Sequence, residues 1–167
     1  MPDSVFHIQE IAMTKEEMIP FHQTLAPALF NASWDILCKE NRTREDEDKL
    51  INIVHASLFH WRQIGEPITI VRGEWMIAHV YTLLGHCEAA LYHAENTLRK
   101  AIEIDVKDWD LAYTYEALAR AYALRQDKEQ FSKFYDLALQ AGAAIVSEDD
   151  RKQFETDMND EYWFGMK

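Results

Sequence analysis

Residues 77–81 read IAHVY, and residues 118–122, which lie 41 positions further along the chain, read LARAY. The same offset relates Leu83 to Leu124. Each copy consists of a helical segment, a break with turn-forming residues, and a second helical segment. A repeated helical hairpin can bury its apolar face only by stacking on neighbouring elements. The repeat therefore predicts an all-α fold of stacked antiparallel helical hairpins.

Capping residues and apolar spacing divide the rest of the chain into further helices, about seven in all. Thr14 opens a capping box, so a helix is expected to begin near Lys15. Pro20 and Pro27 are expected to interrupt or restart that helix, because proline lacks the backbone N–H that a helix uses. The other expected helices cover residues 28–39, 44–63, 68–84, 88–104, 109–124, 128–141 and a short segment from 148, with Thr43, Asp108, Asp127 and Ser147 as N-caps.

Length and charge narrow the class of protein. A chain of 167 residues fits one domain, so a single helical domain over residues 1–167 is expected. The formal net charge is −12, and no cluster of lysines and arginines offsets it. Such a chain repels the phosphates of nucleic acids, so no nucleic-acid partner is expected. The acidic runs at residues 45–48 and 148–150 are interpreted as solvated faces or helix N-termini.

The sequence also indicates where the protein resides. Residues 1–10 lack the basic start and apolar core of a secretion signal, and no apolar stretch approaches membrane-spanning length. No membrane partner is therefore expected. Cys38 and Cys87 do not form a metal-type pair, so we expect free thiols in a reducing cytoplasm, with no cofactor.

Small and aromatic residues recur in a fixed order along the two copies. In this order the copies resemble tetratricopeptide repeats, which implies a short solenoid with two hairpins over residues 72–144. The copies depart from the family in lacking its closing proline, and their spacing exceeds the usual value of about 34. Glu74 also stands where a large apolar residue is usual. The matching positions are Ile77, Ala78, Tyr81, Gly85 and Ala90 in the first copy, and Tyr115, Leu118, Ala119, Tyr122, Phe131, Tyr135 and Ala138 in the second.

Two further likenesses extend this comparison. Leu58, Trp61 and Gly65 align with the end of the first helix of a repeat and suggest a third, partial copy. The stretches at residues 55–61 and 72–75, ahead of the stretch at 109–113, are similar to a small group of uncharacterised bacterial helical-repeat proteins with no established activity. This second likeness implies a bacterial source and a fold, but no function.

Tetratricopeptide arrays usually bind extended peptides on the concave side, which the first helix of each pair lines. The resemblance therefore implies a non-enzymatic module that binds a peptide or protein segment in a groove. Arg62, Arg72 and Arg120 could hold a carboxylate there through forked hydrogen bonds. The implied groove residues are Arg72 and Trp75 with His79 from the first copy, Tyr113, Glu116 and Arg120 from the second, and Asn52 and His55 from the partial copy.

Structural roles for the same residues remain open. Glu116 and Arg120 are four residues apart and could simply pair with each other, and Arg72 could pair with Glu74 or another neighbour. Trp75 could belong to the core. A second alternative is a small-molecule-binding or metal-dependent enzyme with a pocket around His55, His79 and Glu116. No sequence signature specifies such a site, so no catalytic or metal-binding residue is assigned.

The last residues, 160–167, form an aromatic tail that contains Tyr162, Trp163 and Phe164. Such a tail could dock on the body of the protein. It could also contribute to the interface of a homodimer, because aromatic residues are enriched at interfaces.

Overall fold

The computed structural model describes residues 13–160 and 162–167. Residues 1–10, for which no secretion signal is expected, and Glu161 of the aromatic tail lie outside the described residues. Within the described part the chain forms seven helices and no strand, which confirms the all-α prediction. No helix there is both long and apolar enough to cross a membrane. The helices are α1 (Lys15–Leu37), α2 (Arg44–Ile64), α3 (Pro67–Leu83), α4 (Cys87–Glu103), α5 (Asp108–Arg125), α6 (Lys128–Ala143) and α7 (Glu148–Met158).

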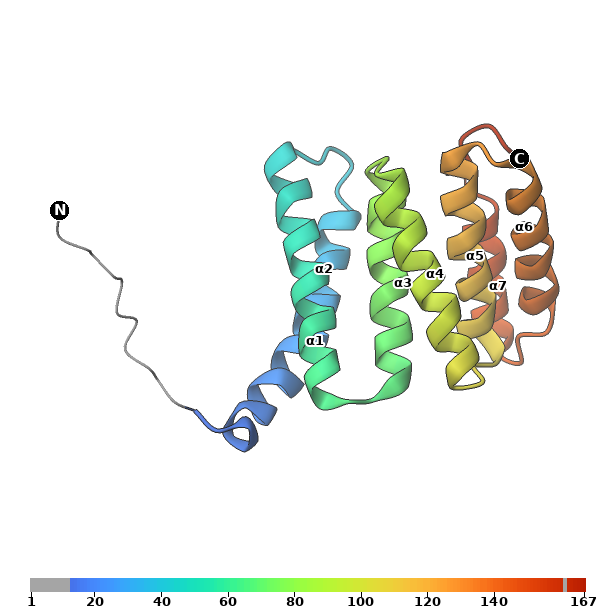
Figure 1. Ribbon diagram of the computed structural model, residues 1–167. Coiled ribbons are helices and arrows are strands. Elements are labelled where there is room, and N and C mark those ends of the chain that lie inside the picture. Colours follow the sequence, from blue (N-terminus) through green and yellow to red (C-terminus); the bar gives the residue numbers. More distant parts are fainter. Residues whose placement is uncertain (1–12, 161) are drawn as a thin grey trace, which may run out of the picture.

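The helices pack as consecutive hairpins. Helix α1 pairs with α2, α3 with α4, and α5 with α6, and these are the most extensive packing contacts in the described chain. Helix α2 also contacts α3, and α4 contacts α5, so the hairpins follow one another in a row (Figure 1). Helix α7 packs against α5 and α6 at the end of that row. The first helices of successive hairpins, α3 and α5, also touch directly.

Several helix starts follow the predicted capping residues. Thr14 and Thr43 form complete capping boxes, and Asp127 and Ser147 each accept a hydrogen bond from a backbone N–H of the first turn. The predicted cap at Asp108 is wrong, because α5 already includes this residue. The carboxylate of Asp108 instead accepts a hydrogen bond from the backbone N–H of Val146, at 3.0 Å, and so ties the start of α5 to the loop before α7.

The predicted break at Pro20 and Pro27 is also wrong, because α1 runs without interruption through both prolines. Each proline deprives one carbonyl, four residues earlier, of its helical donor. Those carbonyls belong to Glu16 and Gln23, which are exposed residues, so water can replace the missing N–H groups. Thr24 also donates its hydroxyl to the carbonyl of Pro20, at 2.9 Å.

Alanines and tyrosines of the repeat hold the hairpins together. Ala78 and Ala119, which occupy the same position in the two copies, are fully buried, and their small side chains let neighbouring helices approach closely. The ring of Tyr122 stacks on Phe134 of α6, with ring centres 5.6 Å apart. Tyr81 stacks on His93 of α4 in the corresponding place, at 5.8 Å. The matched positions therefore make the contacts within each hairpin.

Gly142, near the end of α6, allows α7 to approach closely. A Cβ atom at this position would overlap the ring of Phe154, which is 2% exposed and enclosed by the core. Alanine favours a helix over glycine by about 1 kcal/mol. Overpacking a core costs about 1–3 kcal/mol, so we expect Gly142→Ala to lower the free energy of unfolding in urea denaturation despite the gain in helix propensity.

Gly73→Ala provides the matched control. A Cβ at Gly73 would meet the Cδ1 methyl of Leu58 at 2.9 Å, and a terminal methyl can move aside more easily than a buried ring. A Gly142→Ala variant as stable as the Gly73→Ala variant would contradict close packing between α6 and α7.

Candidate functional site

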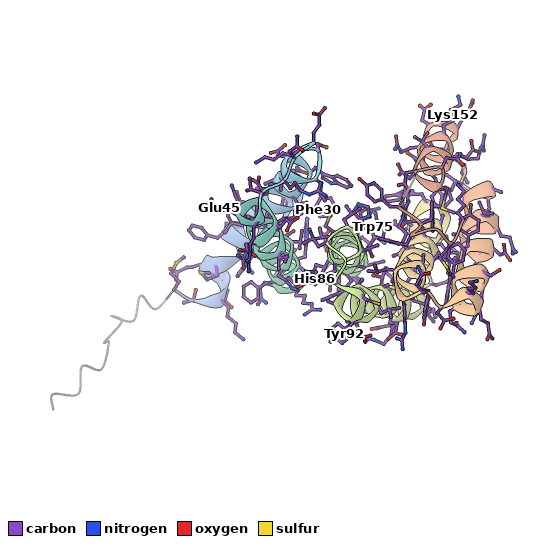
Figure 2. The ribbon with its side chains drawn as sticks, turned by 90° about the horizontal axis from the view of Figure 1, so that it is seen from above. Phe30, Glu45, Trp75, His86, Tyr92 and Lys152 are labelled. Carbon is purple, nitrogen blue, oxygen red and sulfur yellow. The ribbon has the colours of Figure 1, made fainter. Side chains whose placement is uncertain are left out.

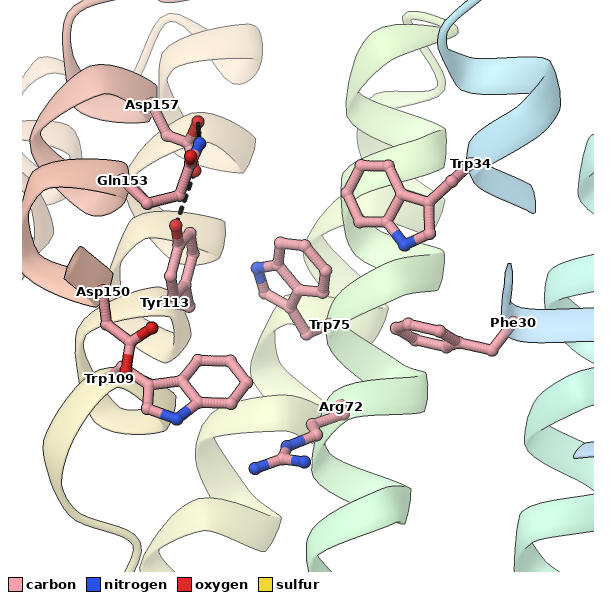
Figure 3. Close-up of a pocket in the computed structure, with 9 residues that line it drawn as sticks. All are labelled: Phe30, Trp34, Arg72, Trp75, Trp109, Tyr113, Asp150, Gln153 and Asp157. Atoms are coloured by element: carbon pink, nitrogen blue, oxygen red, sulfur yellow. Dashed lines mark hydrogen bonds between the residues drawn. The ribbon is translucent and has the colours of Figure 1, made fainter. Parts of the chain in front are cut away.

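A cavity of about 480 Å³ lies between α1, α3, α5 and α7 (Figure 3). Four helices far apart in sequence contribute to its wall, and five of its nine lining residues are aromatic. Polar and charged side chains complete it, mostly from α7. The lining residues are Phe30 and Trp34 from α1, Arg72 and Trp75 from α3, Trp109 and Tyr113 from α5, and Asp150, Gln153 and Asp157 from α7.

A second cavity of about 230 Å³ continues the first. The two share Trp34, Trp75, Tyr113 and Asp157, so together they form one elongated groove, which we call the α1–α7 groove. Figure 2 shows Phe30 and Trp75 on one side of the row of hairpins and Tyr92 of α4 on the other side. Of the residues predicted for a groove, this one contains Arg72, Trp75, His79, Tyr113, Glu116 and Arg120.

Trp75 lies at the centre of the aromatic wall. Its ring meets Tyr113 edge to face, at 5.6 Å between ring centres, and Tyr113 meets Trp109 in the same way at 5.9 Å. The indole N–H of Trp75 donates to Glu116 at 3.2 Å, which fixes the ring on the neighbouring hairpin. Trp34 lies 6.2 Å from Trp75 and is 37% exposed. The groove thus presents a preformed aromatic surface to solvent.

Arg72 is paired with a carboxylate of its own chain. Its Nε and Nη2 atoms donate to the two carboxylate oxygens of Asp110, both at 2.9 Å, and its guanidinium lies 4.5 Å from the ring centre of Trp109. The hydrogen bonds to Asp110 raise the pKa of Arg72. Arg72 therefore pairs with Asp110 of α5 and not with Glu74. Glu74 pairs instead with Arg62, at 2.5 Å.

Arg120 makes more contacts within the protein than Arg72 does. It is 2% exposed and forms ion pairs with Glu116 and Asp160, in the second case through two hydrogen bonds of 2.9 Å. It also donates to the backbone carbonyl of Asp157 at 2.7 Å and lies 4.4 Å from the ring centre of Trp163. Burial alone would lower the pKa of Arg120, but the two carboxylates outweigh burial and raise it. The predicted Glu116–Arg120 pair is confirmed.

These pairings change the expected chemistry of the groove. Arg62, Arg72 and Arg120 were candidates to hold a ligand carboxylate, and each already binds a carboxylate of its own chain. A ligand carboxylate would therefore have to displace an existing ion pair.

His79 lies in the second cavity and stacks on Trp75 with ring centres 5.3 Å apart. Its Nδ1 atom is buried and has no hydrogen-bond partner among the described residues. Burial lowers the pKa of His79 to about 4, and the charge of Arg120 acts in the same direction. His79 is therefore neutral at physiological pH.

Asn52 and His55 do not belong to this groove. The partial copy that suggested them lies on α2, the second helix of its hairpin, whereas the groove is lined by the first helix, α1. Asn52 is exposed, beside a separate shallow cavity. His55 forms a hydrogen bond of 2.9 Å with the hydroxyl of Tyr81, between α2 and α3.

The structure also adds groove residues that the sequence did not indicate. Phe30 and Trp34 of α1 line the groove, and Trp34 is exposed. On α7, residues 150, 153 and 157 follow i, i+3, i+7 spacing and therefore share one face of the helix. This spacing shows in the sequence that the three residues share a face of α7. It does not show that this face lines the groove, because that depends on the packing of α7 beside α5.

The structure does not bring His55 together with His79 and Glu116, which both line the second cavity. His55 binds Tyr81, His79 stacks on Trp75, and Glu116 is paired with Arg120. Across residues 13–160 and 162–167, no three His, Cys, Asp or Glu side chains are placed to hold a metal ion.

The aromatic tail docks on the body of the protein. Trp163 is 2% exposed and packs edge to face on Tyr135 of α6, with ring centres 5.1 Å apart. Tyr162 remains 45% exposed. Trp163 is therefore used within its own chain rather than presented to a partner.

Removing the guanidinium of Arg120 should destabilise the protein strongly. An Arg120→Met substitution leaves the buried carboxylate of Glu116, and that of the partly exposed Asp160, without their cation. Breaking a buried pair in this way costs about 3–5 kcal/mol, which urea denaturation at neutral pH would measure. Arg125→Met, at an exposed arginine of the same helix, is the control and should cost less than about 1 kcal/mol. Equal stabilities of the two variants would show that the Arg120 cluster is not formed.

The stability of the protein should also depend on pH through His79. Its pKa of about 4 in the folded protein is below the ordinary histidine value of 6.5, so the unfolded chain binds a proton first as the pH falls. The free energy of unfolding should therefore decrease between pH 6.5 and pH 4. His79→Phe keeps the stacked ring but cannot titrate, so its stability should decrease less over this range. Parallel pH profiles for the two proteins would argue against a buried, neutral His79.

Compared with protein families, with curated proteins and with solved structures, the chain has no match.

Proposed function

We propose that this chain is a single-domain, tetratricopeptide-like solenoid that binds an extended peptide or protein segment in the α1–α7 groove. The observation that carries the proposal is the preformed aromatic wall built around Trp75, with Trp34 open to solvent. The first helices of the hairpins line this wall, as they do in helical-repeat proteins that bind through one extended face.

The rigidity of the wall supports binding. Trp75 is fixed by its hydrogen bond to Glu116, and Tyr113 is fixed by a hydrogen bond of 2.5 Å to Asp157. Side chains that are already ordered lose little conformational freedom when a partner docks, so more of the contact energy contributes to affinity. Large aromatic side chains in such positions commonly dominate binding energy.

The groove also offers polar groups to an extended backbone. Asp150 and Gln153 are exposed on the α7 side of the groove. A peptide bound in extended form keeps its backbone N–H and C=O groups unpaired unless the receptor supplies partners. A carboxylate accepts from an N–H group, and an amide can both donate and accept. The α7 face is therefore suited to a polypeptide ligand.

A non-enzymatic role fits the protonation states of the groove. Tyr113 with Asp157 is the arrangement that most resembles a nucleophile with a base. Burial raises the pKa of Tyr113, and Asp157 raises it further, so the phenol stays protonated at neutral pH. Glu116 is occupied by Arg120 and Trp75. We therefore favour binding over catalysis.

A cytoplasmic location is part of the same proposal. Cys38 and Cys87 are both free thiols, and Cys38 is exposed. Free, exposed thiols are typical of a reducing compartment.

Truncating Trp34 tests the groove as a binding site. We expect Trp34→Ala to weaken the binding of capped, fluorescein-labelled random peptide pools by about tenfold, measured by fluorescence anisotropy, because it removes an anchor at the groove. The control is Tyr92→Ala, which removes a 62% exposed aromatic side chain from α4, away from the groove. Binding that is absent, or that both variants retain, would refute the proposed site.

A further inference from the structure

The charges that line the first cavity of the groove do not cancel. One cation, Arg72, and two anions, Asp150 and Asp157, belong to the wall. Arg72 is neutralised by the forked pair with Asp110, which lies outside the lining, and its flat face is covered by Trp109. The cavity therefore keeps two carboxylates, and Arg72 does not neutralise either of them.

Asp157 has hydrogen-bond partners but no cation. Its two oxygens accept from the hydroxyl of Tyr113 at 2.5 Å and from the side-chain amide of Gln153 at 2.9 Å, as the dashed lines of Figure 3 show. Both donors are neutral. They hold the carboxylate in place at the groove without removing its charge.

Asp150 is exposed, and the two basic residues that follow it in sequence are engaged elsewhere. Arg151 donates to the backbone carbonyl of Ile145 at 3.2 Å, and Lys152 pairs with Glu148 at 2.7 Å. No ion pair in the described chain involves Asp150 or Asp157. The α7 wall of the cavity is thus an uncompensated anionic edge.

The second cavity does not reverse this sign. It contains Arg120, which is already paired, and Arg42, which donates to the neutral carbonyl of Leu37 at 3.0 Å and so keeps its charge. Three carboxylates line the same space, including Asp157, which both cavities share, so they outnumber the two cations. The first cavity, whose one arginine is paired with Asp110, is therefore the part of the groove that disfavours an anionic ligand.

Trp75 of α3 and Trp34 of α1 stand opposite the anionic edge, while Trp109 of α5 lies beside Asp150 (Figure 3). The face of an indole ring attracts a cation, most strongly among the aromatic side chains. The methylene stem of a lysine or arginine also packs well on such a surface, while its charged head can reach a carboxylate. Figure 3 shows Asp150 and Asp157 on the far side of the cavity from Trp34.

We infer that the segment bound in the α1–α7 groove is basic. A lysine or arginine side chain of that segment enters between Trp34, Trp75 and Trp109 and directs its charge toward Asp150 and Asp157. This inference rests on the proposed function, because it specifies the chemistry of the peptide that the groove takes. The net charge of −12 over the chain favours the approach of such a segment.

The test uses four capped, fluorescein-labelled peptide pools that differ only in one fixed central residue: lysine, arginine, glutamate or leucine. Each pool is titrated with the wild-type protein and with the double variant Asp150→Asn/Asp157→Asn. Asparagine keeps a carbonyl oxygen for the hydroxyl of Tyr113 but carries no charge. The matched control is Asp149→Asn/Glu155→Gln, which removes the same charge from exposed positions of α7 that do not line the groove. Circular dichroism confirms that both variants remain folded.

We expect the lysine and arginine pools to bind the wild-type protein more tightly than the other two pools. The groove variant should bind them about tenfold more weakly, as expected for loss of charge-assisted contacts, and the control should bind them like the wild type. Added salt should reduce the preference for the basic pools, because exposed charges are screened.

Three results would overturn the inference, and they can be told apart. If all pools bind in a manner that requires Trp34, but glutamate or leucine pools bind as tightly as the basic ones, the groove binds peptides and the basic preference is wrong. A basic preference that both double variants weaken equally would reflect the general charge of the protein and would also overturn the inference. If no pool binds, the proposed function itself fails along with the inference.

Discussion

The buried charge cluster of Arg120 holds the groove together. Arg120 lies on α5, and it reaches Asp160 and the backbone carbonyl of Asp157, so one guanidinium fastens the end of α7 to the second repeat copy. Trp163 covers the guanidinium and packs against α6. Helix α7 has only eleven residues, which is too short for stability on its own. Its place beside α5, and hence the anionic wall of the groove, depends on these contacts.

The 41-residue offset of the repeat acquires a direct physical meaning in the structure. Trp75 and Glu116 occupy the same position in the two copies, and the indole N–H of the first donates to the carboxylate of the second. The first helices of adjacent hairpins are thereby bonded through equivalent positions. Glu116 also pairs with Arg120, so the aromatic wall and the cluster that anchors α7 share one carboxylate. The position of Trp75 is consequently coupled to the position of α7.

Features that depend on local sequence pattern could be predicted, whereas features that depend on contacts between distant helices could not. The helical hairpins and most caps follow from period and spacing, and six of the eight groove residues that the tetratricopeptide resemblance implied line the α1–α7 groove. Asn52 and His55 lie outside it because the partial copy that suggested them is α2, the second helix of its hairpin, whereas α1 lines the groove. Asp150 and Asp157 could not be connected to Trp34 from sequence, because α1 and α7 meet across the groove only after the intervening hairpins have stacked.

Internal pairing decides the electrostatic character of the groove. From sequence alone, Arg72 and Arg120 make the site look cationic, since two arginines outnumber the single Glu116 among the predicted residues. In the folded chain Asp110 and Asp160, neither of which was predicted, neutralise those arginines. In the first cavity the remaining charge then comes from residues that pair only with neutral donors or face solvent, namely Asp157 and Asp150. A list of groove residues therefore gives the wrong sign unless each charge is followed to its partner, because a buried ion pair contributes little net field to a ligand beside it.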